Sequence, residues 1–321
     1  MQTHIYKHAS GVDLTLNVFP PRTISSETIT VIHYHGGYLV VGDETTFPPI
    51  WLQKTCSKRS WGYVTPSYRL LPEAKGADVL QDAYDAAVWT VNNQSGRLII
   101  AGSSAGGNLA FYVANRLAAE GKPPVAVLSL YGMLDITKSP YVTAGRTLMN
   151  QPLVLEFDRV ISGIESAKSN QALRGYRFPP SPQDVRMVWV NAIHQAAMYP
   201  DLIADLPGLS AGIRQEGLGA IPADRQDRFP LAFELAADSL PTVLIHGTND
   251  LAVDMSQSSD AAAKLEEHQV KVLLRLVEGA GHGFDVRNIS PDIEIEEIGN
   301  PNPSIKALQQ TINFLDELVC S

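Results

Sequence analysis

The chain has 321 residues, which is enough for two small domains or for one large α/β domain with an insertion. Hydrophobic residues make up 45% of the sequence and charged residues 18%, a composition that indicates a folded globular protein and excludes disordered, collagen-like and coiled-coil chains. The 25 Lys and Arg against 34 Asp and Glu give a net charge of -9, so we expect no nucleic-acid partner.

The start of the chain and its cysteines bear on location. Residues 1–8 lack the apolar core of a signal peptide, and no stretch approaches the ~18 uninterrupted apolar residues of a membrane helix. We therefore expect a cytoplasmic protein without a membrane span. Cys56 and Cys320 are far apart and have no metal-like spacing, so we expect unpaired thiols and no zinc site.

Short β-branched runs alternate with helical patterns along the chain, which is typical of a mostly parallel sheet with helices on both faces. The expected strands, several of them apolar almost throughout, are residues 28–34, 63–66, 97–102, 125–131, 242–247 and 270–276. Apolar residues at helical spacing predict helices over residues 77–91 and 305–319, with Ser304 as the N-cap of the second. The sequence therefore predicts the α/β class.

The alternation lapses between about residues 135 and 241, where prolines punctuate mixed helical stretches. We interpret residues 136–240 as a cap inserted between two strands of a core made of residues 1–135 and 241–321. The cap carries four aromatic side chains that would either line a deep substrate pocket or form the cap's own small core. They are Tyr176, Phe178, Trp189 and Tyr199.

The most informative segment is an apolar strand followed by G-x-S-x-G, formed by Gly102, Ser104 and Gly106, and then by a helix-forming run. A strand that turns sharply into a helix leaves no room for side chains beside the turn, so the glycines relieve crowding while the Ser104 hydroxyl stays exposed. The following helix places its positive end near this hydroxyl. We interpret Ser104 as a nucleophile; the alternative is an ordinary glycine-rich turn.

A serine hydroxyl becomes a nucleophile only when a base takes its proton and an acid orients that base. His282 stands between glycines in a loop just after the last expected strand, so we expect it to be the general base. Asp250 directly follows the strand at 242–247 and is the expected acid. Asp254 competes for this role, and Asp250 as a simple turn residue is the remaining alternative.

Acyl transfer also needs N–H donors for the developing oxyanion. Gly36 and Gly37 end an early strand with bare backbone, and Ala105 follows the candidate nucleophile, so these three residues are the expected oxyanion hole. His33 and His35 could be read as metal ligands, but alternate strand residues point to opposite faces. We expect neither a metal nor a cofactor.

Taken together, these segments resemble the hormone-sensitive-lipase-like esterase branch of the α/β-hydrolase superfamily. The family's H-G-G-G, Y-R-L-x-P-E, G-D-S-A-G-G-N-L-A, D-P-L-R-D and H-G-F segments correspond to residues 35–38, 68–73, 102–110, 250–254 and 282–284. The chain order Ser104, Asp250, His282 is also that of α/β hydrolases. The resemblance implies an α/β-hydrolase fold and a serine esterase that needs no cofactor.

Two positions depart from the family's pattern. Tyr38 replaces the third glycine, and Ser103 replaces the acidic residue before the nucleophile; we expect both to contact the substrate. The resemblance and composition suggest a neutral, moderately hydrophobic ester or lactone as substrate, in polyketide-type specialised metabolism. Elimination, condensation or cyclisation on the same fold, and ligand binding without turnover, are the alternatives. The sequence leaves the oligomeric state open, with a homodimer as one alternative.

Overall fold

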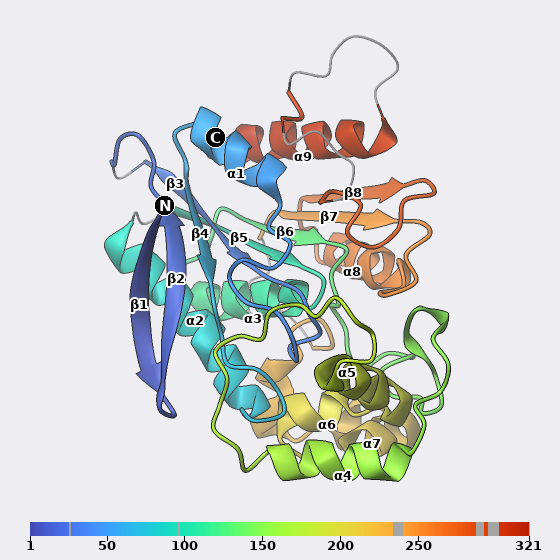
Figure 1. Cartoon of the computed structure of the whole chain (residues 1–321). Coiled ribbons are helices and arrows are strands. Elements are labelled where there is room, and N and C mark those ends of the chain that lie inside the picture. Colours follow the sequence, from blue (N-terminus) through green and yellow to red (C-terminus); the bar gives the residue numbers. More distant parts are fainter. Residues whose placement is uncertain (26, 95–96, 234–239, 287–291, 295–301, 321) are drawn as a thin grey trace.

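The computed structural model describes residues 1–321 except 26, 95–96, 234–239, 287–291, 295–301 and 321. Its described part contains an eight-stranded sheet in the order β1-β2-β4-β3-β5-β6-β7-β8 (Figure 1). The strands are β1 (Gln2–Ala9), β2 (Val12–Phe19), β3 (Ile29–Tyr34), β4 (Gly62–Pro66), β5 (Arg97–Ser103), β6 (Ala126–Leu130), β7 (Thr242–Gly247) and β8 (Val272–Val277). From β4 to β8 all neighbouring strands are parallel, which confirms the predicted α/β fold class.

The six predicted strands are present, with ends shifted by two residues at most, but β1 and β2 were not predicted. These form an antiparallel hairpin in which Ala9 pairs with Val12. Ser10 and Gly11 both have positive φ, 50° and 75°, as the tight two-residue turn of a hairpin requires. Residues before the first predicted strand therefore extend the sheet at one edge.

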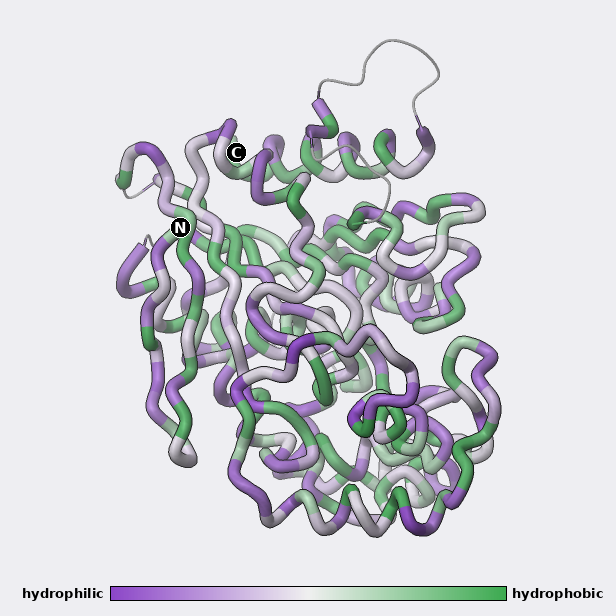
Figure 2. The backbone as a smooth tube through the Cα atoms, viewed as in Figure 1, coloured by the Kyte–Doolittle hydropathy of each residue, from purple (hydrophilic) through white to green (hydrophobic). Residues whose placement is uncertain are grey.

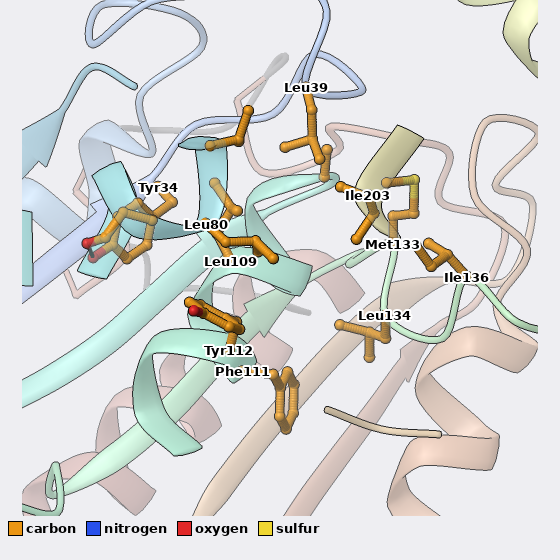
Figure 3. Close-up of a cluster of buried hydrophobic side chains, with 14 of the residues drawn as sticks. Tyr34, Leu39, Leu80, Leu109, Phe111, Tyr112, Met133, Leu134, Ile136 and Ile203 are labelled. Carbon is orange, nitrogen blue, oxygen red and sulfur yellow. Dashed lines mark hydrogen bonds between the residues drawn. The ribbon is translucent and has the colours of Figure 1, made fainter. Parts of the chain in front are cut away.

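Helices cover both faces of the sheet (Figure 1). On one face, α2 (Gly76–Asn93), α3 (Gly106–Ala119) and α8 (Ser256–Glu267) pack over a large apolar cluster. Figure 3 shows part of it, in which Leu80 of α2 and Leu109 of α3 lie near Ile203 from a later helix. On the other face, α1 (Ile50–Lys58) and α9 (Pro303–Cys320) pack over a second cluster. The two clusters hold helices against both faces of the sheet that carries the candidate site.

The hydropathy of the chain follows these layers. Every residue of β3 and β7 is buried, and Figure 2 shows hydrophobic stretches along the central strands.

Within the described ranges, no helix combines the length and the apolar character needed to cross a bilayer. Cys56 is buried and Cys320 exposed, and both are free, as predicted.

The start of α9 corrects one prediction. The helix begins at Pro303, so Ser304 lies inside its first turn and is not the N-cap. Asn302 takes that position: its Oδ1 accepts a hydrogen bond from the Ser304 N–H at 2.9 Å. Both residues are good caps, and the proline, whose fixed φ suits the first helical position, decides between them.

Between β6 and β7 the chain forms a group of helices on one side of the sheet (Figure 1). They are η1 (Leu148–Asn150), α4 (Phe157–Ala167), α5 (Val185–Ala196), α6 (Tyr199–Ala204), α7 (Leu209–Glu216), η2 (Gly217–Ala220) and η3 (Ala223–Arg228). We call residues 136–240 the cap and keep the domain boundaries as a prediction. An antiparallel bridge between Gly42 and Tyr176 joins the cap to the loop after β3.

Candidate active site

Ser104 occupies the tight turn between β5 and α3. Its φ of 54° is left-handed, a strained conformation for a residue with a side chain, and its N–H donates to the Leu130 carbonyl at 2.9 Å. A Cβ on Gly102 would lie 2.0 Å from the Gly106 oxygen, and one on Gly106 would lie 2.2 Å from the Tyr34 oxygen. Both glycines are therefore required by close packing, for the reason that the sequence predicted.

Gly36 and Gly37 lie beside this turn. A Cβ on Gly36 would stand 2.8 Å from the Ser104 Cβ, so the loop after β3 contacts the serine directly. Gly37 has a φ of 109°, which favours glycine, and both glycines line the same cavity as Ser104. Ala105 is buried immediately after Ser104, at the start of α3, and is not among the cavity-lining residues.

Asp250 and His282 meet at the carboxyl ends of β7 and β8. The Asp250 Oδ2 is 2.7 Å from the His282 Nδ1, while its Oδ1 accepts hydrogen bonds from the backbone N–H groups of Ala252 and Val253 at 2.8 and 2.9 Å. Burial disfavours the charged form of Asp250, but the hydrogen bonds from the histidines and the backbone outweigh it and hold the pKa of this carboxyl well below its usual range. Asp254 instead accepts from the Ser256 N–H, so it does not compete for His282.

A second histidine, which was not predicted from the sequence, lies at this carboxylate. His246 is fully buried in β7, and its Nε2 lies 3.3 Å from the Asp250 Oδ2 and 2.9 Å from the Val253 carbonyl oxygen. Its Nδ1 is 2.8 Å from the Ser258 Oγ. The available signal was a histidine at the end of a strand, four residues before the candidate acid. His246 therefore gives Asp250 a second, fully buried partner.

A cavity of about 470 Å³ contains both Ser104 and His282 in its wall. Nδ1 of His282 faces Asp250, so Nε2 lies on the side of the ring away from this carboxylate. Among the described residues that line the cavity there is no Lys, Arg, Asp or Glu. The structure thus places Ser104 and His282 in the wall of one largely apolar cavity, while Asp250 is buried and contacts His282 from outside that wall.

Tyr38 and Ser103 both line this cavity, and their contact with the substrate stays a prediction. The Tyr38 hydroxyl donates to the Ala252 carbonyl at 3.2 Å, so it is directed toward the loop of Asp250. The Ser103 Oγ lies 2.8 Å from the His33 Nε2. Both hydroxyls therefore have protein partners already.

His33 and His35 serve the fold of the site. Burial lowers the pKa of His33 to about 3 and that of His35 to about 4, so both rings are neutral. His35 stacks on Tyr68 at 4.2 Å, and its Nδ1 lies 2.7 Å from the Gly36 oxygen, which supports the glycine loop. No group of three side chains able to hold a metal ion occurs in the described ranges.

The four aromatic side chains of the cap divide between the two predicted roles. Phe178 lines the cavity and meets Phe47 edge-on at 5.0 Å. Tyr199 is fully buried and packs against the Tyr141 ring. Tyr176 and Trp189 flank the Arg186 guanidinium at 5.2 and 5.4 Å. Only Phe178 of these four lines the pocket, and the others stabilise the cap.

The chain is similar to large fungal enzymes. It is 25% identical over 316 residues to the non-reducing polyketide synthase Preu6 of Preussia isomera, which covers 91% of this chain. It is 26% identical over 351 residues to the non-reducing polyketide synthase ausA of Penicillium brasilianum, which covers 98% of this chain. The chain spans about 14% of the length of each of these relatives.

Solved structures and family models agree on the fold. An alpha/beta hydrolase superfamily protein from Enterococcus faecalis aligns with a TM-score of 0.66 and 17% identity, over 95% of this chain and 96% of that one. A thermophilic esterase from Thermogutta terrifontis aligns with a TM-score of 0.56 and 18% identity, over 99% and 94%.

A family model described as the prolyl oligopeptidase family matches residues 215–318, and one described as the alpha/beta hydrolase fold matches residues 31–202. These matches confirm the predicted fold and support the predicted class, a serine-esterase-like carboxylic ester hydrolase. Because the alpha/beta hydrolase fold model matches more than half of the sequence, the chain belongs to the α/β-hydrolase fold family.

Proposed function

We propose that this protein is a serine hydrolase that cleaves a carboxylic ester or lactone of a neutral, moderately hydrophobic small molecule. The observation that carries the proposal is the 2.7 Å contact between Asp250 and His282 at a cavity that also exposes Ser104 on a left-handed turn. A hydroxyl, an imidazole and a buried carboxylate in this order form the arrangement that activates serine for attack on an acyl carbon.

The reaction follows from the positions of these groups. His282 takes the proton of the Ser104 hydroxyl at Nε2 as the oxygen attacks the acyl carbonyl, and it then donates that proton to the departing alcohol. Water, activated by the same histidine, cleaves the acyl-enzyme and releases the acid. Asp250 keeps the Nδ1 proton of His282 in place and stabilises the imidazolium, a role for which its low pKa suits it.

The N–H groups of Gly36, Gly37 and Ala105 are proposed to bind the oxyanion of the tetrahedral intermediate. Gly36 touches Ser104, and Gly37 allows the close approach of the Val41 carbonyl, which a Cβ on Gly37 would meet at 2.0 Å. Ala105 precedes the first residue of α3, so its N–H belongs to the positive end of a 14-residue helix. Such fixed donors are effective because they need no reorientation when the charge develops.

The cavity wall supports the proposed substrate class. Its lining carries no Lys, Arg, Asp or Glu side chain among the described residues, so an ionised substrate would lose hydration without gaining such a side chain as a partner of opposite charge. Phe47, Met149 and Leu251 line it and are 48%, 46% and 57% exposed, which gives the mouth an apolar rim. A volume of about 470 Å³ suits a small molecule.

The similarity to non-reducing polyketide synthases supports a role in polyketide-type metabolism. In those proteins the similar region is a small part of a much longer chain. We infer that the present chain acts on an ester, lactone or related acyl compound of that metabolism.

A fluorophosphonate probe together with hydrolysis of p-nitrophenyl acetate tests this proposal. The probe is expected to label the wild-type chain at Ser104, and Ser104→Ala is expected to lose both labelling and ester hydrolysis. Ser162→Ala, on the exposed face of α4, is the matched control and is expected to retain both. Absence of labelling at Ser104 in the wild type would overturn covalent catalysis.

Product analysis with a panel of aryl esters and lactones separates the alternatives. Free acid and alcohol support hydrolysis, whereas a dehydrated, condensed or cyclised product would show that the site excludes water from the acyl-enzyme or does not form one. A small molecule that stays bound and unchanged through long incubation would instead indicate a binding protein.

A further inference from the structure

Tyr131 lies directly against the candidate base. It follows β6, and its ring meets the His282 ring at 4.7 Å between centroids and an angle of 63°. Its φ of 42° is left-handed, which a tyrosine adopts only where its surroundings hold it. Its N–H donates to the Ile245 carbonyl at 2.7 Å, so the backbone is fixed by the neighbouring strand. The ring is 3% exposed and forms part of the cavity wall.

Asp285 fixes the other end of this ring. Its Oδ1 accepts a hydrogen bond from the Tyr131 hydroxyl at 2.7 Å, and its Oδ2 accepts one from the Trp51 Nε1 at 2.9 Å. The side chain is buried, and burial raises the pKa of this carboxyl even though both donors favour its charged form. A carboxylate in such a place needs its donors to remain in the core. Asp285 comes three residues after His282, on the same loop.

The network extends to the residue before the nucleophile. The Ser103 hydroxyl lies within hydrogen-bonding reach of the Tyr131 oxygen and 2.8 Å from the His33 Nε2. The Tyr131 hydroxyl is therefore connected both to the loop that carries His282 and to the strand that carries Ser104.

A single hydrogen bond does not orient an imidazole completely. The contact between Asp250 and His282 holds Nδ1, but small changes in χ1 and χ2 of His282 can tilt the ring while this hydrogen bond bends. Such a tilt would move Nε2 relative to Ser104. The Tyr131 ring, placed edge-to-face against the imidazole, limits this tilt.

We propose that Tyr131 and Asp285 are positioning residues that hold the His282 ring with its Nε2 toward Ser104, with Asp285 acting through the Tyr131 hydroxyl. This inference rests on the function proposed above. Neither residue contacts the reacting acyl group in this proposal, so substrate binding is expected to depend on them little.

The test compares Tyr131→Phe, Asp285→Asn and the double variant in p-nitrophenyl acetate hydrolysis. Each single variant is expected to lower kcat about 10- to 100-fold with KM within about twofold, because a small misplacement of a reacting group has a large effect on rate. The double variant is expected to be no slower than the slower single variant, since Tyr131→Phe removes and Asp285→Asn weakens the same hydrogen bond. Wild-type kcat in either single variant, or multiplied losses in the double variant, would overturn the proposal.

Trp51→Phe is the matched control. It removes the other donor to Asp285 and leaves the bond between Asp285 and Tyr131 in place, so it is expected to lower the unfolding temperature without the loss in kcat. An equal loss of kcat in Trp51→Phe would indicate a general structural effect and refute positioning through Tyr131.

Proton NMR separates this inference from the proposed function. The low-field Nδ1 proton of His282 in its bond to Asp250 is expected to broaden in Tyr131→Phe and Asp285→Asn, because the loosened ring exchanges with water faster. If the wild type neither reacts with the fluorophosphonate nor cleaves esters, the proposed function fails. The NMR signal then tests the positioning role without the kinetic data. An unchanged signal in both variants would then overturn the positioning role.

Discussion

Replacing Arg186 by methionine is expected to loosen the cap from the core. This side chain extends from α5 in the cap, and its Nη1 donates to the Glu73 Oε1 at 2.7 Å. Its Nη2 donates to the Leu71 carbonyl at 2.6 Å, and its Nε donates to the Val40 carbonyl at 2.8 Å. The side chains of Arg186 and Glu73 are only 3% and 5% exposed. Val40 follows the glycine loop of the proposed oxyanion hole, so one guanidinium joins the cap to that loop.

The magnitude follows from what the substitution leaves behind. Methionine keeps much of the side-chain volume but strands the Glu73 carboxylate and two carbonyl groups away from water. Breaking a buried ion pair on one side costs about 3–5 kcal/mol, because the remaining charge has no partner. This loss corresponds to a roughly 160- to 4,600-fold lower ratio of folded to unfolded protein. Since the Val40 carbonyl loses its donor, we also expect a higher KM for p-nitrophenyl acetate.

Urea unfolding followed by tryptophan fluorescence measures the effect, with ester hydrolysis as the second readout. Adding Glu73→Gln to Arg186→Met removes the stranded charge and is expected to recover at least about 1 kcal/mol. Arg159→Met breaks an exposed ion pair on α4 and is expected to change the free energy of unfolding by less than about 0.5 kcal/mol. A loss below about 1 kcal/mol in Arg186→Met, or a double variant less stable than the single one, would refute the reasoning.

Three further predictions concern the acid, the glycine loop and the last helix. Because the pKa of Asp250 is lower in the folded than in the unfolded protein, this carboxylate stabilises the folded state above about pH 4, the ordinary pKa of an aspartate, and the stabilisation is lost as the pH falls through the folded value. The free energy of unfolding of Asp250→Asn is therefore expected to depend less on pH below about 4 than that of the wild type. The same pH dependence in both proteins would contradict this. Gly36→Ala is expected to lower kcat about 100-fold or more, because the new Cβ would lie 2.8 Å from the Ser104 Cβ. A Cβ on Gly219 would meet open space, so Gly219→Ala is expected to keep the wild-type kcat. Equal rates for the two variants would be inconsistent with the contact between the glycine loop and Ser104. Asn302→Ala is expected to lower the free energy of unfolding by about 1 kcal/mol through loss of the α9 cap, and a larger loss in Ser304→Ala would restore Ser304 as the cap.

Some features of the site were predictable because they are encoded locally. A strand that turns into a helix over Ser104 needs Gly102 and Gly106, and the structure shows the same close contacts that the pattern implied. Buried parallel strands are continuous apolar runs, so six of them could be located from sequence. The missed hairpin of β1 and β2 lies at the sheet edge, where one face is solvated and the apolar signal is correspondingly weaker.

The sequence by itself determined the α/β fold and the residue types of the candidate site, because short segments specify strands, turns and close backbone contacts. Tertiary structure alone decided which carboxylate meets His282, that His246 supports it, and that Arg186 joins the cap to the core. It also decided that Asp285 reaches Tyr131, 154 residues away in the chain. These choices depend on contacts between residues far apart in sequence, whose distances and burial are set only when the sheet, the loops and the cap pack together.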